Sequence, residues 1–265
     1  MRSLFSAQQF GLALCALALV MLSGCATRSV GPANPADPLE ASNRAVFEFN
    51  DAVDRAVLKP VAQAYAAVIP QPIRTCINNI FLNVGDVWSW VNSTLQGRQV
   101  DALNTFGRVL LNSTMGLGGC LDLASQTGAK RIPNDFGVTL GVWGFDSGPY
   151  LVLPIIGSAT VRDGTGRAVD LYVNQVGYGS LINNINVRNS IYGLEVVERR
   201  EALLEVTNTL DRTALDRYSL IRDAYLKRRQ AQVGGATAEA EKLPNYEDYG
   251  AEPADEKALG LTPKK

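Results

Sequence analysis

The chain has 265 residues and a formal net charge of −1, and it contains no histidine. The near-neutral charge provides no basic footprint for nucleic acid, so we expect no nucleic-acid partner. The absence of imidazole excludes Ser-His-Asp and Cys-His nucleophiles and every histidine-ligated metal site. Carboxylate-only and Ser-Lys chemistry stay open, but no spacing suggests them and no G-x-S-x-G sequence is present. We therefore expect a protein that is not an enzyme, with no cofactor or metal.

Residues 1–24 have the pattern of a bacterial secretory signal, because Arg2 precedes a short apolar block that ends in small residues. The sequence LSGC before Ala26 resembles the lipobox, at which Cys25 becomes the first residue of the mature chain and is acylated. The alternatives are an ordinary signal peptide or a buried helix. Each buried acyl methylene contributes about 0.8 kcal/mol of membrane binding. We expect a lipid-anchored protein, and Ala26 resembles the residue that sorts lipoproteins to the outer membrane.

The stretch after the cysteine, residues 25–36, is polar and contains glycine and proline, which predicts a tether. The fold then begins with DPLE. Asp37 suits a helix N-cap, Pro38 the first helical position and Glu40 the third, from which its carboxylate reaches back to the cap.

Apolar residues recur at steps of three and four along most of the remaining chain, which predicts a mainly helical domain over residues 37–230. No apolar run reaches the roughly 18 residues that a spanning helix requires. The predicted helices cover 37–59, then 60–69 after a kink or restart at Pro60, 73–96 after PQP, 100–115, a short helix within 120–135, 167–187, 189–205 and 212–230.

Two segments are predicted to lack a helix. ATVRDGTG contains Asp163-Gly164 and Gly166, which favour a turn. Residues 231–265 are polar and rich in acids, which predicts a disordered tail that is inert or binds a partner. No stretch alternates long enough to suggest a sheet.

One segment is harder to place. Residues 139–157 read TLGVWGFDSGPYLVLPIIG, which is too interrupted by glycine and proline for a plain helix and too apolar for an ordinary surface loop. A hairpin packed in the core and a hairpin that contacts lipid both fit these residues.

The cysteines carry less information. Cys15 leaves with the signal and Cys25 is acylated, so Cys76 and Cys120 remain. In an oxidising compartment they pair in a disulfide, or they stay as two buried thiols.

Seven strings occur in the order found in one family, and together they extend from about Asp37 to Arg229. The chain resembles the MlaA (VacJ) lipoproteins, the outer-membrane component of a phospholipid transport system. The strings are DPLEASNRAVFEFND, KPVAQAYAAVIPQPIR, NNIFLNVGDVW, VNSTLQG, LLNSTMGLGG, DFGVTLGVWGFDSGPYLVLPIIGSATVRD and IRDAYLKRR.

The resemblance implies a ring-shaped helical bundle lying in the inner, periplasmic leaflet of the outer membrane and bound to trimeric porins. An amphipathic channel through the ring lets mislocalised phospholipids leave the outer leaflet for a soluble MlaC-like periplasmic carrier, which maintains lipid asymmetry. The segments 37–69 and 73–96 are the best candidates for apolar faces toward lipid, although core packing is the usual use of such faces.

The resemblance also implies two sets of functional residues. The first is an apolar hairpin beside the channel, in which glycines permit close approach and prolines limit movement, and in which Trp143 and Tyr150 suit a membrane interface. Its residues are Gly137, Leu140, Gly141, Val142, Trp143, Gly144, Phe145, Gly148, Pro149, Tyr150 and Pro154. The second set is cationic side chains that contact phosphate head groups, or else form salt bridges or stay solvated: Arg44, Lys59, Arg74, Arg108 and Arg162.

A scaffold lipoprotein that tethers porins or envelope machinery is the alternative function. Its helices would form an ordinary core, and the apolar hairpin would be a protein interface.

Overall fold

A computed structural model describes residues 37–235, except for the side chains at 175, 176 and 178–181. This part of the chain is mainly helical, as predicted. Its elements are α2 (Glu40–Val53), η1 (Asp54–Leu58), α3 (Lys59–Val68), α4 (Gln71–Leu95), α5 (Gln99–Thr114), α6 (Leu123–Gln126), α7 (Phe136–Val142), β1 (Tyr150–Leu153), β2 (Gly157–Thr160), α8 (Val161–Leu181), α9 (Ile185–Ala202), α10 (Leu204–Thr213) and α11 (Arg217–Gly234).

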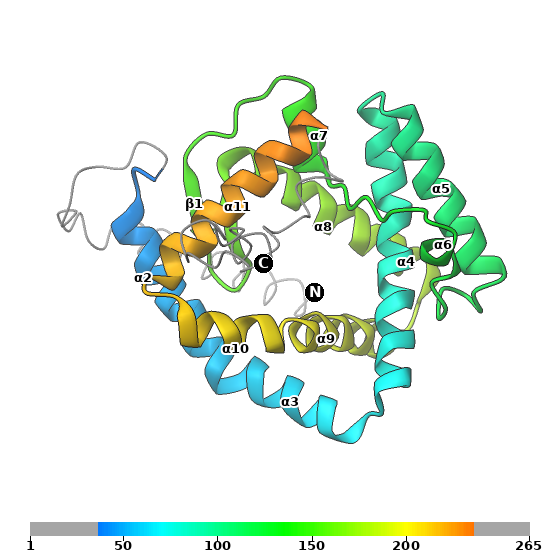
Figure 1. Ribbon diagram of the computed structural model, residues 1–265, viewed down its shortest axis with the longest axis horizontal. Helices are drawn as coiled ribbons and strands as arrows, with labels where there is room; N and C mark the ends of the chain where they lie inside the picture. Colours follow the sequence, from blue (N-terminus) through cyan, green and yellow to red (C-terminus); the bar gives the residue numbers. More distant parts are fainter. Residues whose placement is uncertain (1–36, 236–265) are drawn as a thin grey trace, which may run out of the picture.

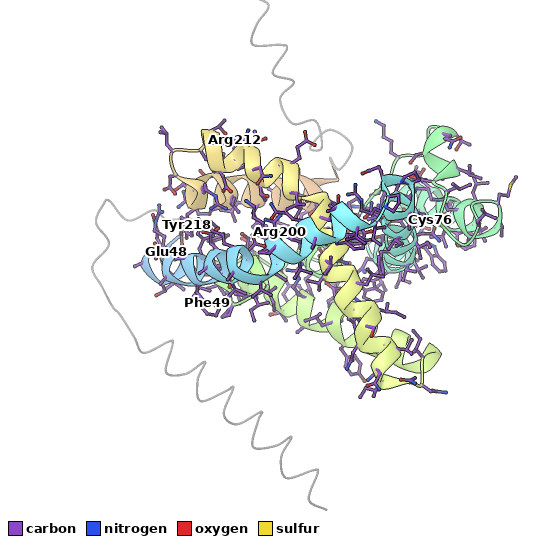
Figure 2. The ribbon with its side chains drawn as sticks, turned by 90° about the horizontal axis from the view of Figure 1, so that it is seen from below. Glu48, Phe49, Cys76, Arg200, Arg212 and Tyr218 are labelled. Carbon is purple, nitrogen blue, oxygen red and sulfur yellow. A yellow bond between two sulfur atoms is a disulfide. The ribbon has the colours of Figure 1, made fainter. Side chains whose placement is uncertain are left out.

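The helices form a ring (Figure 1), with α2 and α3 along one side, α4 across the next, and α7, α8 and α11 opposite α3. Helix α5 packs on the outside of α4, and α9 packs on α3 and α4. Seen from the side (Figure 2), α10 with Arg212 lies on one face of the layer, while α8 and α9 extend from the other face. No described helix is both long enough and apolar enough to cross a membrane.

The start of the fold differs from the predicted cap. Leu39 is the N-cap of α2 and makes no side-chain cap bond. The Asp37 carboxylate instead accepts hydrogen bonds from Asn43 Nδ2, at 2.8 Å, and from the Tyr218 hydroxyl, at 2.5 Å. Asp37 therefore ties the first helix to α11, and this distant contact displaces the local cap.

The predicted break at Pro60 is a change of helix type. The π-helical turn η1 connects α2 to α3, and Pro60 lies in the first turn of α3. Proline has no N–H and crowds the preceding turn, so a wider turn just before it removes both conflicts. The next proline motif ends α3 as predicted, but Pro72 itself belongs to the first turn of α4, where a missing N–H costs nothing.

Helix α8 begins earlier than predicted. Asp163, Gly164 and Gly166 are helical rather than a turn. A Cβ placed on Gly166 would lie 2.3 Å from the Gly137 nitrogen. The glycine therefore permits α7 and α8 to cross in close contact, and this tertiary packing outweighs the local turn preference.

The prediction that no sheet forms is also wrong. β1 and β2 pair antiparallel from Tyr150 opposite Thr160 to Leu153 opposite Gly157. Strands of four residues are too short to produce a visible alternation in the sequence.

The last helix has different bounds from those predicted. Arg212 belongs to α10, and α11 starts after Asp216, whose carboxylate accepts from the Ser219 N–H. Helix α11 extends past Gln230 to Gly234, and Gly235, whose φ is 84°, caps it in the left-handed conformation. The tail was predicted to begin at residue 231, and this bound is wrong because residues 231–234 are helical. The rest of the predicted tail from 236 onward, the signal and tether, and Cys25 lie outside the described residues.

Candidate functional site

The inner side of the ring has an open cavity of about 640 Å³, which we call the central cavity. Helices α4, α8, α9 and α11 contribute to its wall, together with strand β2 and the segment before α7. Apolar side chains such as Phe81, Leu82 and Leu171 share this wall with charged ones. The cavity therefore offers both apolar and polar surface to a single ligand.

Two helices present a continuous face to the central cavity. On α8 the lining residues are Asp163, Arg167, Asp170, Leu171 and Asn174, and on α11 they are Tyr225, Arg228, Arg229 and Gln232. Both sets follow the three- and four-residue steps of one helix face.

Arg229 joins these two faces. Its guanidinium is buried and donates to Asp135 Oδ1 at 2.8 Å and to Asp163 Oδ1 at 2.9 Å. Tyr225 donates its hydroxyl to Asp163 Oδ2 at 2.7 Å. Burial alone would raise the pKa of Asp163, but the hydrogen bonds and charge of Arg229 lower it to about 2. The wall is thus fixed by an ionised, fully bonded cluster.

The remaining cavity arginines divide into two kinds. Arg131 pairs with Asp86 at 2.8 Å, and Arg199 pairs with Glu195 at 2.5 Å. Arg167 and Arg228 are exposed toward the cavity. Within residues 37–235, neither of these two side chains has a hydrogen bond or an ion pair. They are the cations available to a ligand.

Two cavity carboxyl groups are engaged by neutral donors. Asp170 accepts from Trp88 Nε1 at 2.7 Å and from the Phe136 N–H at 3.1 Å. Burial raises the pKa of Asp170, although these donors and Arg167 oppose the shift. Glu198 accepts from the Tyr65 hydroxyl at 2.5 Å, and burial together with this carboxylate raises the pKa of Tyr65 to about 12.

The segment expected to form a hairpin has two different parts. Gly137, Leu140, Gly141 and Val142 lie on helix α7, and the hairpin proper is β1 and β2. A connecting loop contains Gly144, Gly148 and Pro149, and Pro154 lies in the turn between the strands. Gly137 and Gly141 provide close contacts for Arg229, Asp163 and Arg162. Helix α7 was not predicted, because Gly137 and Gly141 were interpreted as hairpin residues, whereas in the structure they permit close packing.

The aromatic residues of this segment also separate. Trp143 and Phe145 are half exposed, at 50% and 59%. Tyr150 is buried in a cluster with Val152 and Tyr218, and its hydroxyl bonds to the Ser158 hydroxyl at 2.8 Å. Tyr150 is therefore a core residue, and the prediction that it lies at an interface is wrong. Lipid contact by Trp143 and Phe145 stays a prediction.

Two asparagines of α2 hold the hairpin in place. Asn43 donates to the Tyr150 carbonyl at 3.0 Å and accepts from the Val152 N–H at 2.9 Å. Asn50 does the same for the Leu153 carbonyl and the Ile155 N–H, at 3.0 and 2.7 Å. The two amides therefore satisfy the edge of β1 as a neighbouring strand would.

The tip of the hairpin is apolar and strained. Ile155 is 74% exposed and has a φ of 65°, a conformation that costs a β-branched residue of order 1–3 kcal/mol.

All five cations predicted to contact head groups form ion pairs, and none of them lines the central cavity. Head-group contact by these residues stays a prediction. Their carboxylate partners are Asp216 for Arg44, Asp211 for Lys59, Glu201 for Arg74, Asp86 and Asp122 for Arg108, and Asp163 for Arg162.

Sequence reasoning missed Arg167 because RDGTGR was interpreted as a turn, which hid the one-turn spacing between Asp163 and Arg167. The three- and four-residue spacing of Tyr225, Arg228 and Arg229 was visible in the sequence, and it could have identified Arg228.

Cys76 and Cys120 form a disulfide that connects α4 to the segment between α5 and α6. Among the described residues, no group of three or more Cys, Asp or Glu is placed to hold a metal ion.

Large apolar side chains are exposed on helices around the ring, and those named here do not line the central cavity. Examples on α3, α4 and α5 are Val61, Val68, Ile73, Leu95, Val100, Leu103 and Leu110. Exposed apolar side chains mark a contact with lipid or with another protein where they gather into a patch.

Comparison with known proteins gives a consistent result. Residues 35–232 match the family model of the MlaA lipoprotein. The chain is 33% identical to the intermembrane phospholipid transport system lipoprotein MlaA of Escherichia coli K12, over 87% of this chain and 91% of that protein. It is 34% identical to the protein of the same name from Haemophilus influenzae, over 86% of this chain and 93% of the relative.

A solved structure is similar in fold as well. It comes from work on the structural basis for maintenance of bacterial outer membrane lipid asymmetry. The two chains are 34% identical with a TM-score of 0.63, and the match covers 74% of this chain and 98% of the other.

Proposed function

Because the chain belongs to the MlaA lipoprotein family, we propose that it carries phospholipids through the central cavity, as the outer-membrane part of an intermembrane transport system. Mislocalised phospholipid leaves the outer leaflet through the ring and passes to a soluble periplasmic carrier. Cys25 supplies the lipid anchor, and trimeric porins are the membrane partners. No bond is made or broken in this process, so the protein is not an enzyme.

The observation that carries the proposal is the mixed lining of the central cavity inside a ring whose helices expose many large apolar side chains. A charged head group cannot enter hydrocarbon without polar partners. Arginine and asparagine side chains of the wall supply such partners, while Phe81, Leu82 and Leu171 offer apolar surface to the tails. The exposed apolar side chains on α3, α4 and α5 suit burial of the ring in one leaflet, and we assign it to the periplasmic leaflet.

The first test is genetic. Deleting the gene is expected to raise the phospholipid content of the outer leaflet, and a plasmid copy is expected to reverse the rise. An unchanged outer leaflet, in cells without a second member of the family, would overturn the proposal and favour a scaffold.

A cross-linking test separates lipid transport from scaffolding. A photo-activated residue at Phe145 is expected to give adducts with the mass of a phospholipid, since this side chain is 59% exposed beside the hairpin. Adducts with protein alone would identify the segment as a protein interface.

A further inference from the structure

We propose that Arg167 and Arg228 form a binding subsite for the phosphodiester of a phospholipid head group inside the central cavity. This inference rests on the proposed function and gives it specific residues.

The two arginines belong to cavity faces that are fixed relative to one another. Arg167 follows Asp163 by one turn of α8, and Arg228 precedes Arg229 on α11. Asp163 and Arg229 are joined by a buried ion pair of 2.9 Å. The backbone at both arginines is therefore held in place, while their guanidinium groups stay unbonded in the described structure.

The described carboxylates around the cavity do not hydrogen-bond to these two guanidinium groups. Both oxygens of Asp135 and both of Asp163 accept from Arg229. Asp170 acts on Arg167 only through its charge, because its hydrogen bonds come from Trp88 and the Phe136 N–H, and the hydrogen bond of Glu198 comes from Tyr65. Two guanidinium groups thus remain for an anion, and guanidinium forms two parallel bonds to phosphate oxygens.

The neighbouring side chains favour a lipid over free phosphate. Leu171 follows Asp170 on the same face of α8, and Phe81, Leu82 and Leu203 line the same cavity. An inorganic phosphate gains nothing from these apolar groups, whereas acyl chains gain about 25 cal/mol for each square ångström removed from water.

The test measures lipid binding to the purified full chain in detergent micelles by native mass spectrometry. Three probes are compared, namely phosphatidylglycerol, diacylglycerol with the same acyl chains, and inorganic phosphate. The double variant Arg167→Gln and Arg228→Gln is expected to bind phosphatidylglycerol at least tenfold more weakly, with diacylglycerol binding unchanged. Arg167→Lys with Arg228→Lys is expected to recover part of the loss, because ammonium keeps the charge but not the bidentate geometry.

Arg212→Gln is the matched control. Arg212 is also exposed and unpaired among the described residues, but it lies on α10 outside the cavity lining (Figure 2). It is expected to leave binding unchanged. Circular dichroism of each variant verifies the fold. The fold is expected to be unchanged, because the replaced side chains are exposed and make no hydrogen bond in the described structure.

The outcomes separate this inference from the proposed function. If wild type binds phosphatidylglycerol and the double variant binds it equally well, the subsite is wrong while lipid entry into the cavity stands. If wild type binds neither lipid, both proposals are overturned. Phosphate binding as tight as lipid binding would assign the arginines to free phosphate and overturn the lipid subsite.

Discussion

Arginines inside the wall of the central cavity and arginines exposed to the cavity have opposite roles. Arg229, in the wall, is buried and bonded to two carboxylates from different parts of the chain. Arg228, the next residue, reaches the cavity without a partner in the described structure. Adjacent residues on one helix therefore have different tasks, since one holds the ring together and the other stays available to a ligand. Residue type alone does not reveal this difference, because the partners decide it.

The largest expected effect comes from breaking the wall. Arg229→Gln removes the cation of Asp135 and leaves the buried Asp163 with Arg162 alone, which is expected to lower the free energy of unfolding by roughly 3–5 kcal/mol. Arg228→Gln, one residue away, is expected to change it by less than about 0.5 kcal/mol. Urea unfolding of the two variants measures the contrast, and equal losses would contradict the division.

A covalent bond holds a different part of the ring, and its removal is expected to have the next largest effect. The disulfide joins residues 44 positions apart, so replacing Cys76 and Cys120 by serine is expected to cost roughly 2–4 kcal/mol by freeing the unfolded chain. Thermal unfolding with and without reductant checks this. Reductant should lower the Tm of wild type and leave that of the variant unchanged. An unchanged Tm in fully reduced wild type would count against a stabilising disulfide.

Asn43 and Asn50, which hold the hairpin in place, are expected to differ less in their contributions to stability. Asn43→Ala strands the Tyr150 carbonyl and the Val152 N–H, and a loss of about 2 kcal/mol is expected. Asn50→Ala affects groups at the exposed turn that water can reach, so a loss of less than about 1 kcal/mol is expected. Hydrogen exchange at the Val152 amide should accelerate in the first variant only. Equal acceleration in both would mean that the two amides act as one unit.

Lowering the pH should weaken the cluster of Asp135, Asp163 and Arg229 in the cavity wall, because its carboxylates become protonated. The pKa of Asp163 is lowered to about 2 and that of Asp135 is also lowered. A lowered pKa stabilises the fold above about pH 4, where both states are ionised, and the stabilisation is lost as the pH falls toward 2. Wild type is expected to lose about 2 kcal/mol from Asp163 over this interval. In Arg229→Gln this loss is expected to be smaller, because Asp163 keeps only Arg162 and the Tyr225 hydroxyl as partners and its pKa is lowered less. Urea unfolding between pH 2 and 5 tests this, and the same slope in both proteins would contradict it.

Whether a feature could be predicted from the sequence depends on how far apart along the chain its interacting residues lie. Helices α4 and α5 were predicted to within two residues because their apolar spacing is a local signal. The start of α8 was not, because Gly166 serves a crossing with α7 that no local pattern reveals. Some of the cations chosen from the sequence have partners far along the chain, such as Asp216, 172 residues from Arg44, and Glu201, 127 residues from Arg74, although Arg162 pairs with its neighbour Asp163. Charge can be read from a sequence, but whether a charge is already neutralised cannot.

The most direct test of the central claim is to narrow the cavity and measure the outer leaflet. Gly85 lines the cavity, and a Cβ there would meet only Arg131 at 3.7 Å, an ordinary contact. Alanine therefore fits, whereas tryptophan places an indole in the path of a lipid. In a deletion strain with equal amounts of each variant, Gly85→Ala is predicted to restore low outer-leaflet phospholipid and Gly85→Trp to leave it as high as in the deletion. Full restoration by Gly85→Trp would contradict passage through the cavity.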